Sequence, residues 1–342
     1  MESGPLASRL VGKKIGKWLV ISKRIKDRKD SSGFFSTCYE VKDDKGNIGF
    51  LKAYNYQYAF GKAAGSADKL KFMLENFTYE RDLLKFCRDR KMRRVVTAID
   101  SGEYSEEIEI IPVPYLVFEV AQGSLKTYNF VKNPDLAWKL LAFHGALVGL
   151  SQLHREKIAH QDIKPSNILI FGKNYSKISD LGSATQRDKN SNWCHDQHEG
   201  DWRYAPIELF YGYCSPDWNT RRFGADLFMM GGLLSYMITG ANFLSLMVSN
   251  LPERVRPFRY GGTFLEAKPY LMDAYYQALD IVETSIPDRI RAELKIVLSE
   301  LCQPVPEDRG NPTLTRGRVE QYSLIRYIPK IDRMSKAILR VG

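Results

Sequence analysis

Cysteine is scarce in this sequence, and no two cysteines are spaced as a redox motif would space them. Five cysteines are scattered over 342 residues, an odd number without Cys-x-x-Cys spacing. A disulfide framework needs paired cysteines and an oxidising compartment, so we expect a cytoplasmic protein. Cys194, His195 and His198 form a small Cys-His-x-x-His cluster, but no second ligand pair lies nearby in the sequence, and a metal site there is not favoured.

An uninterrupted apolar segment of membrane-spanning length is also missing. Residues 1–14 lack the apolar core of a signal peptide. Residues 225–248 are long enough to span a bilayer, but Asp226 lies at their start and several glycines interrupt them. A buried helix, a break near Gly240 and a second helix fit this pattern better, and we expect no membrane span.

Internal repeats and low-complexity tracts are absent too, which excludes fibrous and disordered classes. The chain does carry a surplus of positive charge, with 50 Lys and Arg against 40 Asp and Glu. Such a surplus suits anionic partners, including nucleic acid. The densest basic run, residues 88–94, has no interleaved aromatic residues, so a solvated connection is favoured and nucleic acid stays an alternative partner.

The two halves of the chain have different hydrophobic patterns. Residues 15–60 and 95–120 contain the β-branched and aromatic runs typical of strands, around one helical stretch at 68–88. Later segments are mainly helical in spacing, and 342 residues exceed a typical single core. We therefore expect an α+β protein with an extension (1–14), a small β-rich lobe (15–120) and a larger helical lobe (121–342) that ends in a helix.

One segment, HQDIKPSNILI at residues 160–170, sets a carboxylate, a cation and an amide at fixed offsets. Asn167, with Asp180 from the later segment SDLG, offers oxygen atoms of the kind that Mg²⁺ prefers. Asp162 would then accept a proton from a hydroxyl group, and Lys164 would offset charge on a transferring phosphoryl group. This division of labour is that of phosphoryl transfer.

These residues resemble the motifs of eukaryotic-type serine/threonine protein kinases. HQDIKPSN is similar to their catalytic loop, and DLG at residues 180–182 to their Asp-Phe-Gly metal motif. The resemblance implies a bilobal protein-kinase-like fold and an enzyme that transfers the γ-phosphoryl group of ATP to Ser or Thr of a protein substrate. It implies that Asp162 and Lys164 are catalytic, and that Asn167 and Asp180 bind Mg²⁺, with Mn²⁺ as an alternative.

Further positions match landmarks of this family in the expected order. Lys52 matches the lysine that contacts the α- and β-phosphates, and Glu80 matches its glutamate partner, with Glu75 the less favoured substitute. Residues 116–125 (LVFEVAQGSL) resemble the hinge between the lobes. There Phe118 matches the gatekeeper, and the backbone at Glu119 and Ala121 is implied to contact adenine.

Three more landmarks are structural in the family. GDWRYAPIE at residues 200–208 resembles the end of an activation segment, whose Glu208 is implied to pair with a buried Arg309. Asp226 matches the aspartate that supports the catalytic loop. The chain between Glu208 and Arg309 exceeds the family minimum, and we place the surplus at 211–222 and 241–290 as a candidate docking surface.

The sequence departs from the family pattern in the glycine-rich loop, residues 31–39 (SSGFFSTCY). Gly33 keeps its place, whereas Ser31 and Ser36 replace glycines that let backbone N–H groups approach phosphate. Gly33, Ser36 and Cys38 are the ATP-binding candidates in this loop. Serine is small and donates a hydrogen bond, so we expect ATP binding that is weaker than usual.

Two further departures concern regulation and the acceptor. Gln161 replaces the arginine that usually pairs with a phosphorylated activation segment, so we expect activation by loop phosphorylation to be weak or absent. Asp201 stands where serine/threonine kinases usually carry Thr, and it would either pair with Lys164 or repel Asp162. These departures keep open a pseudokinase scaffold as the alternative to an active kinase, with a small-molecule phosphotransferase as a third reading.

Overall fold

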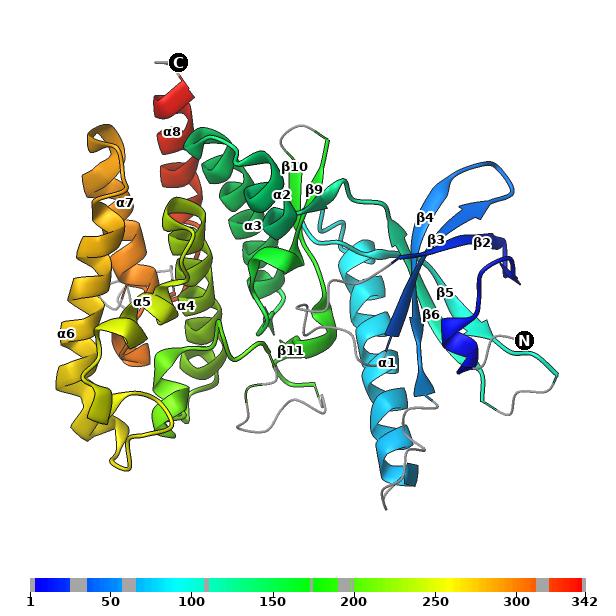
Figure 1. Cartoon of the computed structure of the whole chain (residues 1–342), viewed down its shortest axis with the longest axis horizontal. Coiled ribbons are helices and arrows are strands. Elements are labelled where there is room, and N and C mark those ends of the chain that lie inside the picture. Colours follow the sequence, from blue (N-terminus) through cyan, green and yellow to red (C-terminus); the bar gives the residue numbers. More distant parts are fainter. Residues whose placement is uncertain are drawn as a thin grey trace. The chain divides into compact units, whose positions relative to one another are not determined.

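A computed structural model describes residues 4–24, 36–56, 66–107, 111–172, 175–189, 198, 200–311 and 320–339. The chain divides into two compact units, Met1–Ala121 and Gln122–Gly342. In the described residues, the first unit is a β-sheet with one long helix and the second is mainly helical (Figure 1). The expected α+β class, with a β-rich first lobe and a helical second lobe, is confirmed.

The first unit is built on one antiparallel sheet of order β1-β2-β3-β4-β6-β5. A turn at Asp43 joins β3 to β4, because its Oδ1 accepts hydrogen bonds from the backbone N–H groups of Lys45 and Asn47 at 3.0 and 2.8 Å. Gly46 in this turn has a φ of 88°, which a glycine adopts without strain. The strands are β1 (Lys14–Ile15), β2 (Trp18–Arg24), β3 (Ser36–Asp43), β4 (Ile48–Tyr54), β5 (Ala98–Tyr104) and β6 (Val113–Glu119).

The segment before the sheet packs into the same core. Leu6 and Leu10 are buried with Ile15 and strand residues of β2 to β4 and β6. The hydroxyl of Tyr39 donates to the carbonyl of residue 7 at 2.8 Å, which fixes this segment to β3. Residues 6–10 therefore contribute to the core of the first unit.

The long helix of the first unit, α1 (Ser66–Asp89), is close to the 68–88 predicted from hydrophobic spacing. Phe77 and Leu84 are buried on its inner face. Glu80 lies on the same face and is only 5% exposed, because residues three and four apart share one side of a helix. A carboxylate is thus carried into the interior of this unit.

The second unit is organised around α4 (Trp218–Thr239), which packs on α3, α5, α6 and α7. Gly231 allows close approach, because a Cβ there would meet Cys302 Sγ at 2.2 Å. The other helices are α2 (Leu125–Lys132), α3 (Leu136–Arg155), α5 (Phe243–Asn250), α6 (Phe264–Glu283), α7 (Asp288–Leu301) and α8 (Tyr327–Leu339), and the short strands are β7 (Gly123–Ser124), β8 (Ile158–Ala159), β9 (Ile168–Phe171), β10 (Tyr175–Ile178) and β11 (Thr185–Gln186).

Helix ends in this unit follow capping residues visible in the sequence. Asp135 caps α3, since its Oδ1 accepts from the backbone of Trp138 at 2.7 Å. Gly240 ends α4 at a φ of 79°, and α5 starts three residues later. Among the described helices, α3 is apolar and long enough to cross a membrane, and 61% of that stretch is buried in the protein. Helices α4 and α5 together would also qualify, with an 86° bend between them.

The last helix, α8, has a buried face. Its basic residues suggest a solvated helix, but Tyr327, Ile331 and Met334 are at most 1% exposed. The helix packs against α3 (Figure 1). Charged side chains therefore occupy only one side of α8, and its apolar side belongs to the core of the second unit.

Candidate active site

In the first unit, Lys52 and Glu80 form the ion pair that the sequence predicts. Lys52 Nζ lies 3.1 Å from Glu80 Oε1, and the two side chains are 21% and 6% exposed. Glu75 instead lies 3.9 Å from Lys71 on the exposed side of α1. The structure therefore brings Lys52 to Glu80 rather than to Glu75, and the more exposed Lys52 keeps an ammonium group within reach of a ligand.

Tyr54 is a member of this cluster that sequence reasoning missed. It lies two residues after Lys52 on β4, so both side chains project from one face of the strand. Its hydroxyl donates to Glu80 Oε2 at 2.6 Å. Burial, followed by the charge of Glu80, raises the pKa of Tyr54 well above its ordinary value. Tyr54 thus stays a neutral donor that orients the glutamate.

Of the other nucleotide-binding candidates of the first unit, Ala121 follows β6, and the rest lie on strands or outside the described residues. Cys38 is paired with Lys52 across the β3–β4 ladder and is 7% exposed, and Ser36 begins β3. Phe118 is buried near the end of β6, where Glu119 is the last residue. Gly33 lies outside the described residues, and so do Cys194 and His195 of the cysteine–histidine cluster.

In the second unit, Asp226 of α4 holds the backbone of the loop that precedes β9. Its Oδ2 accepts from the N–H of His160 and its Oδ1 from that of Gln161, both at 2.8 Å. His154, at the end of α3, places Nε2 2.8 Å from the same carboxylate and was not predicted as a partner. Asp226 is fully buried, so these donors replace water and stabilise one loop conformation.

His160 joins this loop to the segment that carries Asp180. Its Nδ1 accepts from the N–H of Asp162 at 3.2 Å, which leaves Nε2 to donate to the carbonyl of Ser179 at 3.0 Å. The N–H and hydroxyl of Ser179 in turn donate to the carbonyl of Asn167 at 2.8 and 2.9 Å. The structure therefore brings Asn167 and Asp180 into one neighbourhood, with His160 as a packing residue.

The Asp162 carboxylate is surrounded by donors. Lys164 Nζ lies 2.8 Å from its Oδ2, and Asn167 Nδ2 donates to the same oxygen at 2.9 Å. The N–H of Asp201 donates to Oδ1 at 2.9 Å. Burial raises the pKa of Asp162, Lys164 opposes this rise, and the charge of Asp180 adds to it. A carboxylate with a raised pKa is a better proton acceptor than an ordinary one.

The candidate metal ligands are Asn167 and Asp180. The Asn167 amide donates through Nδ2 to both the carbonyl and the carboxylate of Asp162, so its Oδ1 is the atom that can coordinate a cation. Asp180 has the left-handed backbone values φ 65° and ψ 79°, which are uncommon outside glycine. No group of three or more His, Cys, Asp or Glu suited to a metal occurs in the described part of the chain. Two oxygen ligands fit Mg²⁺, which keeps waters and substrate phosphates in its shell.

The Asp201 side chain is oriented by Arg203, which was not predicted from the sequence as its partner. Arg203 donates to both of its carboxylate oxygens, at 2.9 and 2.6 Å, and Lys164 Nζ lies 3.9 Å away. Burial disfavours the charged form, but the hydrogen bonds from Arg203 outweigh it, and the pKa of Asp201 lies below its ordinary value. Of the two alternatives for Asp201, the geometry favours attraction to cations, because its carboxylate accepts two hydrogen bonds from Arg203 and lies 3.9 Å from Lys164.

Close contacts fix both ends of the segment at residues 200–208. Gly200 packs so closely that a Cβ would meet the carbonyl of Gln161 at 2.1 Å, and only glycine fits. Glu208 pairs with Arg309 through two hydrogen bonds of 3.0 and 2.8 Å, and Arg309 is fully buried. Arg309 also donates to the carbonyls of Gly224 and Gln303. The structure thus joins the predicted glutamate and arginine across the second unit.

Comparison with known proteins agrees with this arrangement. A family model described as the protein kinase domain matches residues 31–316. The serine/threonine-protein kinase PBL35 of Arabidopsis thaliana is 29% identical over 48% of this chain and 33% of its own length. Receptor-like cytoplasmic kinase 176 of Oryza sativa subsp. japonica is 27% identical over 59% and 55%. The receptor protein-tyrosine kinase CEPR2 of A. thaliana is 32% identical over 37% and 13%. The chain spans 55% or less of the length of each of these relatives.

Proposed function

This chain belongs to the protein kinase family, and from that premise we propose that it is an active kinase that transfers the γ-phosphoryl group of ATP to Ser or Thr of a protein substrate. The relatives do not decide between Ser/Thr and Tyr as the acceptor, because they include kinases named for serine/threonine and for tyrosine. Lys164, two residues after Asp162, supports Ser or Thr, since tyrosine-directed members usually place this basic residue elsewhere.

The proposed roles follow from the side-chain environments. Asp162 orients the acceptor hydroxyl and takes its proton, and Lys164 offsets charge on the transferring group. Lys52, held by Glu80, contacts the phosphates of ATP. Asn167 and Asp180 bind Mg²⁺, which would neutralise charge on the outer phosphates.

The observation that carries the proposal is the set of contacts to one carboxylate. Lys164 Nζ and Asn167 Nδ2 both reach Asp162 Oδ2, at 2.8 and 2.9 Å, in a loop whose side chains are almost fully buried. The structural carboxylate of Asp226 accepts from backbone N–H groups and from the side chains of His154 and Gln161. At Asp162, by contrast, the ammonium group of Lys164 and the amide of Asn167 converge on the carboxylate.

Incubation of the purified protein with γ-labelled ATP, Mg²⁺ and a generic acceptor protein tests this proposal. We expect label in the acceptor and in the kinase itself, phosphoamino acid analysis to give phosphoserine or phosphothreonine, and an Asp162→Asn variant to lose the label. Equal labelling with the variant would contradict the proposal, and label in tyrosine alone would contradict the acceptor class.

A pseudokinase that binds nucleotide without phosphoryl transfer is the second candidate. Two observations favour it: serines stand in the glycine-rich loop, and the carboxylate of Asp201 lies 3.9 Å from Lys164, where it competes for that cation. This candidate predicts that ATP raises the melting temperature of the wild-type protein while no label is transferred.

We also propose that the protein works in the cytoplasm. The sequence has five cysteines, an odd number, and no two of them have Cys-x-x-Cys spacing. Such a pattern is typical of a reducing compartment rather than of a disulfide framework. Fluorescence microscopy of the tagged chain in cells of its source tests this proposal, and secretion of the protein would contradict it.

A further inference from the structure

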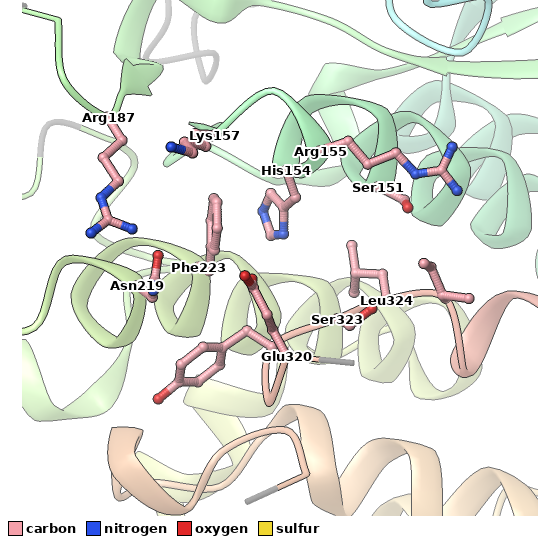
Figure 2. Close-up of a pocket in the computed structure, with 12 residues that line it drawn as sticks. Ser151, His154, Arg155, Lys157, Arg187, Asn219, Phe223, Glu320, Ser323 and Leu324 are labelled. Atoms are coloured by element: carbon pink, nitrogen blue, oxygen red, sulfur yellow. The ribbon is translucent and has the colours of Figure 1, made fainter. Parts of the chain in front are cut away.

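The second unit contains a pocket of about 310 Å³, and His154, the partner of Asp226, is the one lining residue that it shares with the candidate active site as described above. It lies where the end of α3, the turns beside β8 and β11, the start of α4 and residues 320–325 meet (Figure 2). This volume is at the lower end of the range typical of small-ligand sites. The pocket is therefore large enough for a side chain together with a bound anion.

One end of the pocket is cationic. Lys157 and Arg187 line it there, with the amide of Asn219 nearby (Figure 2). The N–H of Arg187 donates to the carbonyl of Lys157 at 2.9 Å, which holds the two residues side by side. Arg187 also stacks over Trp218, 6.0 Å from the ring centroid. Two cations and an amide at one place suit a dianion, and the planar guanidinium matches phosphate in particular.

The backbone conformation of Lys157 is unusual for a lysine. Its φ is 57°, in the left-handed region where glycine is the relaxed choice. The chain nevertheless places a long cationic side chain at this position. Asp188 Oδ2 lies 3.8 Å from Lys157 Nζ, and both side chains are more than half exposed. Such an exposed pair contributes little, so a phosphate can displace Asp188 from Lys157.

Two stacked rings form the middle of the pocket. The rings of His154 and Phe223 stack with centroids 4.0 Å apart, and Figure 2 shows them between Arg187 and Arg155. The bond from His154 to Asp226 fixes the orientation of this floor. A small inorganic anion would leave the floor uncovered, whereas a side chain that ends in phosphate would cover it. Arg155, at the other end, suits an acidic neighbour in the same peptide.

We propose that this pocket docks a phosphorylated side chain of a partner protein, with the phosphate at Lys157 and Arg187 and an acidic flanking residue at Arg155. Glu320 is the single carboxylate among the lining residues, so its charge opposes the ligand. The proposal concerns binding alone and does not depend on phosphoryl transfer, so the Asp162→Asn variant serves equally well as the protein under test.

Fluorescence anisotropy with short degenerate peptide pools centred on phosphoserine, phosphothreonine or phosphotyrosine tests the proposal. We expect at least one pool to bind and its unphosphorylated counterpart not to bind. A Lys157→Gln/Arg187→Gln variant should weaken binding by about tenfold for each charge-assisted contact that is lost. Glu320→Gln should strengthen binding, and added salt should weaken it.

The matched control is Arg259→Gln/Arg333→Gln, which removes the same charge from exposed residues outside the pocket. These arginines pair with Glu253 and Glu293, respectively. The control should bind the peptide as the wild type does, and thermal melts should show that both double variants fold. Three outcomes would overturn the proposal: no pool binds, the control weakens binding as much as the pocket variant, or inorganic phosphate or AMP competes as well as the phosphopeptide.

Discussion

Gln161 and Arg222 are joined by two hydrogen bonds, one donated by each residue. The amide of Gln161 donates to the carbonyl of Arg222 at 2.9 Å, and the Arg222 guanidinium donates to Gln161 Oε1 at 3.1 Å. Gln161 also donates to Asp226 at 3.1 Å, and both Gln161 and Arg222 are almost fully buried. The loop that carries Asp162 is thus tied to α4 by contacts that need no phosphate.

This tie predicts a kinase that does not need a phosphorylated activation segment. Gln161 has no charge to pair with a phosphate, and its hydrogen bonds are used inside the second unit. Thr185, a hydroxyl residue shortly after the DLG motif, is 1% exposed. We expect phosphatase treatment to leave the phosphotransfer rate unchanged, with phosphate removal verified by mass spectrometry. A large loss of rate after that treatment would show that a phosphate orders the loop.

The proximity of Asp201 to Lys164 predicts a gain of activity on neutralisation. A carboxylate 3.9 Å from Lys164 competes with the incoming phosphoryl group for the same cation. Asp201→Asn keeps the backbone donor to Asp162 and removes the charge, so kcat/KM should rise severalfold. Arg203→Gln, which leaves the Asp201 charge uncompensated, should lower it. A drop in kcat/KM for Asp201→Asn would mean that the carboxylate positions the acceptor.

The raised pKa of Asp162 predicts that kcat is lost at a higher pH on acidification than an ordinary carboxyl group would cause. Asp162 must be ionised to accept a proton, so kcat should fall as the pH drops through its pKa, at a higher pH than for an ordinary carboxyl group. Lys164 holds that pKa down. Lys164→Met should therefore lower kcat and move the acid limb of the pH profile to higher pH. A limb that stays in place would show that another group titrates.

The buried pair of Glu208 and Arg309 predicts a large stability effect. Arg309→Met leaves a carboxylate buried without its partner, and the free energy of unfolding should fall by about 3–5 kcal/mol. The double variant Glu208→Gln/Arg309→Met should recover part of the loss, because no charge stays buried. Chemical denaturation measures both. Arg259→Gln, at an exposed pair, should change stability by less than about 1 kcal/mol, and an equal effect there would contradict the argument.

The lowered pKa of the buried His198 predicts that the free energy of unfolding falls in mild acid. Burial lowers its pKa from 6.5 to about 4, and its Nε2 has no hydrogen-bond partner among the described residues. The unfolded chain therefore binds a proton before the folded chain does. Stability should be full above pH 6.5 and fall as the pH drops toward 4, by on the order of 3 kcal/mol. His198→Gln should flatten this part of the curve of unfolding free energy against pH, and an unchanged slope would assign it to other groups.

Much of the fold could be predicted because local signals agreed with the packing. The helix at residues 68–88 follows from hydrophobic spacing, and the break at Gly240 follows from glycine's freedom at positive φ. The final helix was predicted less well. Its basic residues suggest a solvated surface, whereas its apolar side packs on α3, and composition alone does not reveal which side finds a partner.

The candidate site also contains residues that could be predicted from the sequence and residues that could not. Asp162, Lys164, Asn167 and Asp180 could be picked out because their residue types and spacing fit one chemistry. Tyr54 lies in a strand and looks like an ordinary aromatic residue there. Its role depends on Glu80, which lies 26 positions away and reaches Tyr54 only through packing.

The sequence by itself determined the class of fold and the residues suited to phosphoryl transfer, because both are written in short-range patterns. Tertiary structure alone decided which partners share each charge: Arg203 for Asp201, Arg222 for Gln161 and His154 for Asp226. It also assembled the cationic pocket from segments far apart in the chain. Hydrogen bonds and charge interactions act over a few ångströms in space, and distance along the chain does not reveal them.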